Sequence, residues 1–198
     1  MTLDETKAGS AEAVSIVPGR GCGGCALCCK IMRIEELDKP KGAWCPHCAP
    51  NRAGCTIYDS RPRECRTFHC AWLTLERLGP EWQPTRAKMV LSFEAGGKRI
   101  VVHVDPGTPA AWRAEPYLGQ IRRWAQAAVD HAGQVVVHVR DRAIVILPNK
   151  EVDVGTFAPG DVIVVRERAT ASGRDFDAYK VAAADVAARK DAGARAGA

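Results

Sequence analysis

Most of this sequence lacks cysteine, and no part of it contains a long apolar run. Residues 71–198 contain no cysteine, although nine cysteines stand between Cys22 and Cys70. No stretch approaches the roughly eighteen apolar residues of a membrane-spanning helix, so we expect no membrane partner. The opening MTLDETKAGSAEAV is acidic where a signal peptide is basic, and it has no apolar segment for secretion. We therefore expect a cytoplasmic protein.

Several familiar catalytic motifs are also absent. The sequence contains no P-loop, no G-x-S-x-G and no H-E-x-x-H, so these motifs give no reason to expect an enzyme. The formal charge of +5 is scattered along the chain and assumes neutral thiols. Two divalent ions, each bound by four thiolates, would lower that charge to about +1. We therefore expect no nucleic-acid partner, whereas a protein partner stays open.

The composition divides the chain into four parts. We expect a flexible tail over residues 1–18, a cysteine module over 19–82, an α+β domain over 83–168, and an alanine-rich tail, partly helical or disordered, over 169–198. The module has too few periodic apolar residues to be stabilised by a hydrophobic core alone. The predicted fold class is α+β, with a small metal-stabilised N-terminal module. A two-layer domain of mainly antiparallel sheet with one main helix follows it.

The elements of the α+β domain follow from its hydrophobic patterns. KMVLSFE and KRIVVHVD predict one hairpin, and QVVVHVR and RAIVILP predict a second. Between them, apolar residues from Tyr117 to Ala128 recur at helical spacing, with Pro116 suited to the first turn and Gly133 to the C-terminal cap. VDVG and DVIVVRER predict further short strands, and DAYKVAAADVAARK predicts a peripheral helix.

His103 and His138 occupy equivalent places in two of the predicted strands. Valines alternate with both histidines, so the two rings are expected to lie on the opposite face and to point to solvent. If the strands paired in register, the rings would meet across the sheet. A second site at this pair is therefore an alternative hypothesis.

The cysteines occur in three runs with the spacing of metal ligands. In GCGGCALCCK, a helical turn would place Cys25, Cys28 and Cys29 on one face, and Cys22 can join them from the glycine-rich lead-in. Cys45-Pro-His-Cys48 repeats the two-residue spacing. The candidate metal ligands are all nine cysteines: Cys22, Cys25, Cys28, Cys29, Cys45, Cys48, Cys55, Cys65 and Cys70.

In a reducing compartment this pattern predicts a metal site rather than disulfides. Two tetrahedral zinc sites need eight ligands, which the cysteines supply with His47 and His69 in reserve. One [4Fe–4S] cluster needs four, and C-x2-C-x2-C resembles part of a ferredoxin run. The expected cofactor is therefore zinc or iron, including an iron–sulfur cluster. Whether Cys28 and Cys29 serve two ions or bridge one stays open.

Other interpretations compete for parts of the module. Cys45-Pro-His-Cys48 also occurs as a redox dithiol, but that motif needs a buried strand before it and a helix after it, and the flanking sequences predict neither. Arg61 and Arg66 are expected to offset thiolate charge through N–H···S contacts. Tyr58 is expected to belong to a small apolar plug.

The cysteine runs resemble a known family. CGGCALCC, a Cys-Pro and CTIYDSRPRECRTFHC, in that order, resemble the motif of the CxxCxxCC cysteine-cluster family (YkgJ-type), described as a zinc- or iron-chelating domain. The resemblance covers about residues 20–72, and it matches every cysteine except Cys48, which stands where many members have an apolar residue. A similar module in flagellin lysine methylases implies an iron–sulfur cluster. The resemblance defines the module and leaves its task open.

Two hypotheses follow for function. The first is a metal-binding protein without catalysis of its own, acting in metal handling or in interaction with a protein partner. The second is an enzyme or electron carrier that uses an iron–sulfur or non-haem iron centre. A ligand set made of sulfur alone favours closed, structural sites, which supports the first hypothesis.

Overall fold

The structure, a computed structural model, describes residues 14–22, 24–171 and 173–188. It confirms the α+β class, since these residues form a five-stranded sheet, a two-stranded sheet and one main helix. Of the two expected tails, residues 1–13 and 189–198 lie outside the described residues, whereas most of 169–188 is described and forms strand and helix. Within the described part, Val17 donates its N–H to the carbonyl of Leu73 at 2.9 Å. The end of the predicted N-terminal tail is therefore bound to the segment around Leu73.

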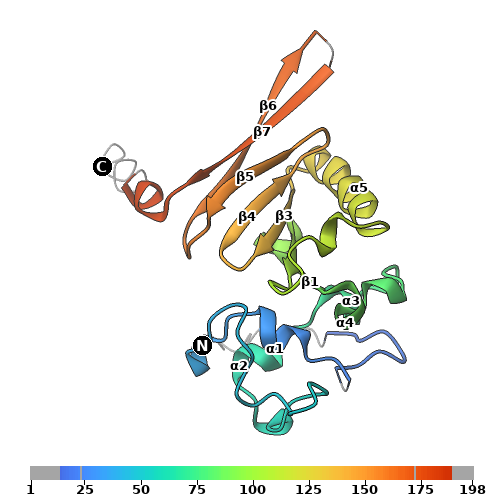
Figure 1. Cartoon of the computed structure of the whole chain (residues 1–198). Helices are drawn as coiled ribbons and strands as arrows, with labels where there is room; N and C mark the ends of the chain where they lie inside the picture. The colour runs from blue at the N-terminus through green and yellow to red at the C-terminus, as the bar shows by residue number, and fades with distance from the viewer. Residues whose placement is uncertain (1–13, 23, 172, 189–198) are drawn as a thin grey trace, which may run out of the picture.

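The larger sheet has its strands in chain order (Figure 1). They are β1 (Met89–Glu94), β2 (Arg99–Val104), β3 (Gln134–Val139), β4 (Arg142–Ile146) and β5 (Glu151–Thr156). The β2–β3 pair is parallel and the other pairs are antiparallel, which confirms both predicted hairpins. The parallel pair requires a crossover, and helix α5 (Tyr117–Asp130) provides it.

Helix α5 covers one face of the sheet with the predicted apolar side. Ile121 and Ala125 are buried there against the valines of β2 and β3. The helix ends at Asp130, and the Gly133 N–H returns to the Ala128 carbonyl at 2.7 Å. A Cβ at Gly133 would lie 2.8 Å from the Lys98 carbonyl oxygen, so the close approach of helix and sheet requires glycine here.

A separate hairpin, β6 (Val162–Thr170) with β7 (Gly173–Val181), lies on the face of the sheet opposite to α5 (Figure 1). Ile163, Phe176 and Ala178 pack against β3 and β4 there. The strand predicted from DVIVVRER is confirmed as β6, whereas the helix predicted from DAYKVAAADVAARK is only partly right, because residues 177–181 belong to β7 and helix begins at residue 183. The cause is the period-two placement of Phe176 and Ala178, which gives the strand a buried face.

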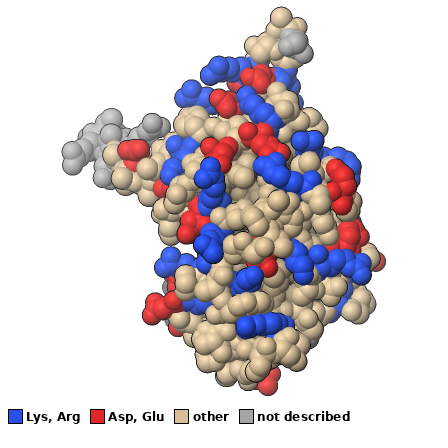
Figure 2. Space-filling view, in the orientation of Figure 1, with Lys and Arg blue, Asp and Glu red and all other residues tan. Residues whose placement is uncertain are grey.

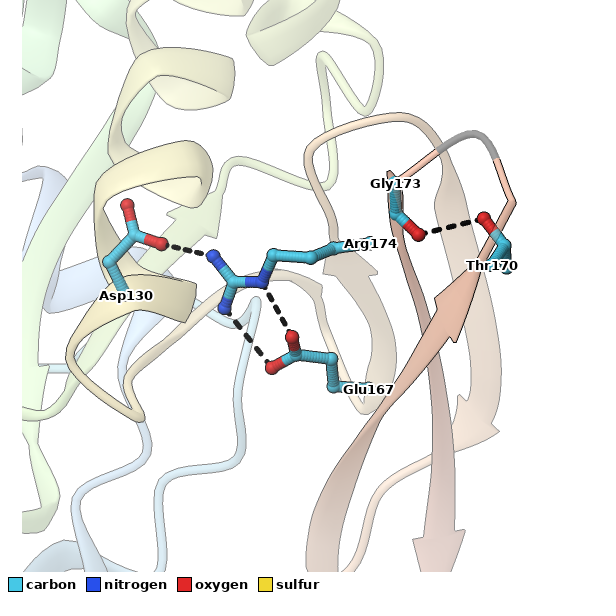
Figure 3. Close-up of polar contacts among 5 residues, drawn as sticks. All are labelled: Asp130, Glu167, Thr170, Gly173 and Arg174. Carbon is cyan, nitrogen blue, oxygen red and sulfur yellow. Dashed lines mark hydrogen bonds and ion pairs between the residues drawn. The ribbon is translucent and has the colours of Figure 1, made fainter.

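Arg174 fastens this hairpin to the end of α5 (Figure 3). Its guanidinium donates to both carboxylate oxygens of Glu167, at 2.6 and 3.1 Å, and to Asp130 at 2.6 Å. Asp130 is the last residue of α5, where the helix dipole disfavours an acidic side chain. Arg174 therefore offsets that charge and joins β7 to α5.

The cysteine module is built from short helices and loops. The helices are α1 (Leu27–Ile31), α2 (Arg63–Thr67) and α3 (Ala71–Thr74), followed by α4 (Pro84–Ala87) at the start of the sheet domain. Single 3-10 turns occur in the module and in the sheet domain, at Glu35–Leu37, Tyr58–Ser60, Pro80–Trp82, Ala95–Gly97 and Ala111–Arg113. The module packs against edge strand β1 (Figure 1), where Leu27, Ile31 and Leu73 surround Val90.

The predicted border at residue 82 differs from the packing. Leu78 and Trp82 are buried in the core between α5 and the sheet. The Trp82 ring lies 5.0 Å from that of Tyr117 and 4.9 Å from that of Trp124. Residues 71–82 thus contribute to the core of the α+β domain as well as packing against the cysteine module.

Charged side chains are unevenly distributed on the face shown in Figure 2. Both signs are interspersed over the β6–β7 hairpin and the sheet, while the region over the cysteine module is mostly uncharged.

Candidate metal centre

The cysteine module contains a cavity of about 740 Å³. Eight of the nine predicted ligands line it: Cys22, Cys25, Cys28, Cys29, Cys45, Cys55, Cys65 and Cys70. Cys48 is buried but does not line the cavity. Cys48 instead packs in an apolar cluster with Cys29, Cys45 and Cys65. All nine are free thiols.

A first group of thiols packs against β1. Cys22, Cys25, Cys28 and Cys70 share one apolar cluster with Leu27, Ile31, Leu73 and Val90. The backbone supports this grouping, because the Cys25 N–H donates to the Cys22 carbonyl at 3.0 Å in a tight turn. Cys70 comes from the residue immediately before α3.

A second group lies on the other side of α1. Cys29, Cys45, Cys48 and Cys65 share a cluster with Ala26 and Ile34. The Cys45 N–H donates to the Cys29 carbonyl at 2.9 Å, which holds these two cysteines together. Cys55 interacts electrostatically with Cys65, and its backbone pairs with that of Cys48 in an isolated antiparallel bridge.

The chain around Cys55 and Cys65 has almost no core of its own. From residue 49 to residue 69 no residue is buried. Helix α2, which carries Cys65, has no side-chain cap from its own N-terminal residue. Instead, the Glu36 carboxylate accepts the N–H groups of Arg63 at 3.2 Å and Glu64 at 2.8 Å. Glu64 in turn accepts the Glu35 N–H at 2.8 Å, so the two segments cap each other.

Lys39 places a buried amino group beside the second group of thiols. It is 4% exposed, and its Nζ donates to the carbonyls of Pro40 at 3.0 Å, Lys30 at 3.3 Å and Met32. Three acceptors match the three N–H bonds of an ammonium group. Burial lowers the pKa of Lys39, and thiolate charge on its cysteine neighbours, first Cys45 and then Cys29, opposes that shift.

No carboxylate pairs with Lys39 among the ion pairs of the described residues. A buried cation is costly without an opposite charge. The nearby thiols, as thiolates, are the groups that can supply that charge. The donor set is therefore of the kind that suits zinc or iron, in which cysteine binds as a thiolate.

Two further polar groups at the cavity wall have no acceptor in the described part of the chain. These are the Nε–H of Arg61 and the indole N–H of Trp72, and both atoms are buried. Arg61 lies close enough to Cys22 to lower the pKa of that thiol, although burial raises it more. The Arg61 guanidinium stacks 3.8 Å from the ring of Tyr58. Tyr58 is 48% exposed, so the predicted apolar plug is wrong at this residue.

The thiols perturb one another. Burial raises the pKa of Cys65, of Cys48 and of Cys70, the last to about 11. A hydrogen bond between the neighbouring thiols lowers the pKa of Cys29 to about 7 and raises that of Cys28 well above its ordinary value. Without a cation, crowding therefore favours the protonated form at most of these positions.

The two histidines predicted as reserve ligands also lie at the cavity. His47 and His69 line the cavity, and the His69 ring lies 3.2 Å from the carbonyl of Thr67. Within residues 14–22, 24–171 and 173–188, no three His, Cys, Asp or Glu side chains stand close enough together to hold an ion as placed. The structure thus gathers the thiols around one space without fixing a coordination geometry.

His103 and His138 meet across the β2–β3 pair, as register pairing requires. Their ring centroids are 5.9 Å apart, and the Ser92 hydroxyl lies 2.9 Å from Nε2 of His103. The expected exposure to solvent is wrong, since each residue is 7% exposed. A layer covers this face of the sheet, and the Phe157 ring lies 5.6 Å from that of His138. Burial lowers the pKa of His103 to about 3 and that of His138 to about 4.

No helix in the described part of the chain combines the length and the apolar character needed to cross a membrane. Comparison with known proteins adds no relative. The chain matches no family model, no curated protein and no solved structure. The resemblance to the CxxCxxCC family therefore rests on the motif alone.

Sequence reasoning missed the polar residues that hold the thiols in place. Lys39 and Glu36 lie in the segment IEELDKPK, and both side chains hydrogen-bond to backbone groups. The sequence did contain one indication of their role. This charged segment links two cysteine runs and has few apolar residues, so its buried side chains must include polar ones.

Proposed function

We propose that this protein binds zinc or iron through the thiolates of its cysteine module, and that the bound metal gives the module its shape. The expected role is non-catalytic, in metal handling or in presenting the module to a protein partner. The protein is further proposed to act in the cytoplasm and to belong to the CxxCxxCC cysteine-cluster family, as its motif suggests.

One observation carries the proposal: eight thiols line one cavity, and the stretch from residue 49 to residue 69, which carries two of them, buries no residue. A structural zinc ion contributes about 10–16 kcal/mol of apparent free energy at neutral pH. The net stability of a whole domain is about 5–15 kcal/mol, so metal can supply what apolar burial does not. The buried ammonium group of Lys39 supports thiolates rather than thiols at this place.

The alternative is a redox protein or enzyme with an iron–sulfur or non-haem iron centre. It is favoured by the surplus of thiols and by the cavity, which has more space than a single ion needs. Bound iron would supply electron transfer, while the chain's own residues would hold it and keep it from solvent. The Cys45–Cys48 pair gives little support to dithiol chemistry, since it is preceded by a turn and followed by an irregular loop.

Metal analysis of protein purified without oxygen tests the proposal. We expect at least one equivalent of zinc or iron per chain. A colourless preparation would favour zinc, and a brown one with sulfide would favour an iron–sulfur cluster. Less than one equivalent of any metal, together with freely reactive thiols, would contradict both the non-catalytic and the redox hypothesis.

A further inference from the structure

The adjacent cysteines Cys28 and Cys29 lie in the same short helix, α1. Consecutive residues of an α-helix point about 100° apart, because a turn contains 3.6 residues. Leu27 and Ile31, which bracket them, pack toward β1 together with Cys28. Cys29 packs instead with Ala26 and Ile34 on the other side of the helix. The two side chains thus pack into two different apolar clusters, while their thiols remain within hydrogen-bond reach of each other.

From this division we propose that the module holds two separate thiolate centres, one on each side of α1. The first is formed by Cys22, Cys25, Cys28 and Cys70, and the second by Cys29, Cys45, Cys55 and Cys65. The inference rests on the proposed function, and it adds the number of centres and the ligands of each. Each centre takes a thiophilic metal, either a zinc ion or an iron–sulfur cluster.

The first centre joins the two ends of the module. Three of its cysteines come from residues 22–28 and the fourth from the start of α3. Its surroundings are apolar apart from two buried donors, the Arg61 Nε–H and the Trp72 indole N–H, which lack an acceptor in the described residues. Four thiolates on a divalent ion leave a net charge of −2, and sulfur carrying such charge accepts N–H hydrogen bonds. The two donors are placed to serve this centre.

The second centre has its own counter-charge. The buried ammonium group of Lys39 is held by three carbonyls, and its thiol neighbours are Cys45, Cys29, Cys28 and Cys65, of which all but Cys28 belong to this centre. The backbone hydrogen bond between Cys45 and Cys29 keeps two of the ligands together. Arg61 thus lies near Cys22 of the first centre, and Lys39 acts most strongly on Cys45 and Cys29 of the second.

The fourth ligand of the second centre is assigned to Cys55 rather than Cys48. Cys55 lines the cavity together with Cys29, Cys45 and Cys65, whereas Cys48 does not. Cys48 is 7% exposed and fills space in an apolar cluster, which a small hydrophobic residue can also do. Cys55 lies in a stretch where no residue is buried, so packing gives it no role.

Stepwise metal loss with thiol labelling tests the division on the unaltered protein. A chelator is added in increments under reducing conditions, the metal retained is measured, and each reactive cysteine is alkylated and identified by peptide mass. We expect two sets of reactive thiols, Cys22, Cys25, Cys28 and Cys70 in one and Cys29, Cys45, Cys55 and Cys65 in the other. About half of the metal should leave with each set. Release of all eight thiols in one step would overturn the division.

Two matched variants test the assignment of Cys55. Cys55→Ala is expected to lose about half of the bound metal, and Cys48→Ala is expected to keep all of it. The opposite result would overturn the assignment. Iron and sulfide analysis of the same samples distinguishes a cluster from a zinc ion. A protein that binds no metal would refute the proposed function itself, while one that binds metal in a single indivisible set would refute only the two centres.

Discussion

Lys30 and Asp105 join the cysteine module to the sheet, with Nζ of Lys30 2.6 Å from Oδ1 of Asp105. Lys30 follows Cys29 in α1, and Asp105 follows the last residue of β2. Both side chains are largely buried, and the same carboxylate oxygen accepts the Gly107 N–H at 2.8 Å. The charged pair therefore fixes α1, and with it Cys28 and Cys29, relative to the α+β domain.

Asp105→Asn is expected to loosen the contact between module and sheet. The amide keeps an oxygen for Gly107 but loses the charge opposite Lys30, which should cost about 1–3 kcal/mol in the free energy of unfolding. Urea unfolding followed by tryptophan fluorescence gives this value. Lys30→Met should cost a similar amount, and the double variant should cost less than the sum. Strict additivity of the two changes would contradict a direct interaction.

The buried histidines predict a loss of stability in mild acid. The folded pKa values of His103 and His138, about 3 and about 4, lie below the ordinary value of 6.5. From about pH 6 down to 4 the unfolded chain therefore binds protons that the folded chain excludes, so stability falls as the pH falls. Two such groups give a slope of at most about 2.7 kcal/mol per pH unit.

Urea unfolding at several pH values between 7 and 5 measures that slope, and His138→Gln isolates its source. Both proteins carry the same cysteine module, so acid release of metal affects them alike. The positively charged neighbours Lys41 and Arg99 oppose protonation of His138, whereas Asp141 favours it. The variant should show a clearly shallower slope than the parent. Identical slopes would contradict the origin of the effect in the buried pair.

Lys39→Met removes the positive charge beside the second group of thiols. Residues of this kind, which contact ligands rather than metal, typically change metal affinity by about 10–100-fold. We expect weakening in that range, measured by competition with a chelator of known affinity. Lys98→Met is the control, because Lys98 is exposed in the turn between β1 and β2. Equal affinities for both variants would argue against a thiolate partner for Lys39.

Arg174→Ala is expected to release the β6–β7 hairpin from α5. The variant loses the contacts to Glu167 and Asp130, so backbone amides of β6 and β7 should exchange faster with solvent. Amides of β2 and β3 should be unaffected. Arg168→Ala provides the control from the same hairpin, since Arg168 is exposed. Unchanged exchange in the hairpin would show that its apolar contacts alone hold it.

The sequence predicted the elements whose pattern is local. Alternation fixed the β1–β2 and β3–β4 hairpins, and helical spacing from Tyr117 onward gave α5. The strand β7 was mistaken for a helix because alanine and charged residues follow it without a break, and its buried partners lie in β3 and β4. The burial of the two histidines was missed for the same reason, since the layer that covers them is distant in sequence.

The thiols that line the cavity were all among the predicted ligands, but their arrangement was not predictable. The two-residue spacing of Cys22, Cys25 and Cys28 expresses a local turn, so the sequence could group these thiols. It could not assign Cys55 and Cys70, which reach the cavity from separate segments. Lys39 and Glu36 carry no ligand signal at all, and their roles follow from hydrogen bonds to distant backbone.

Hydrogen exchange of residues 20–70 before and after metal removal tests most directly whether metal–thiolate bonds shape the module. The metal should be removed by strong chelation under reducing conditions, and its loss confirmed by elemental analysis. We predict that exchange protection in this stretch collapses, while protection of β2 and β3 persists. Unchanged protection in the metal-free, reduced protein would contradict the proposal.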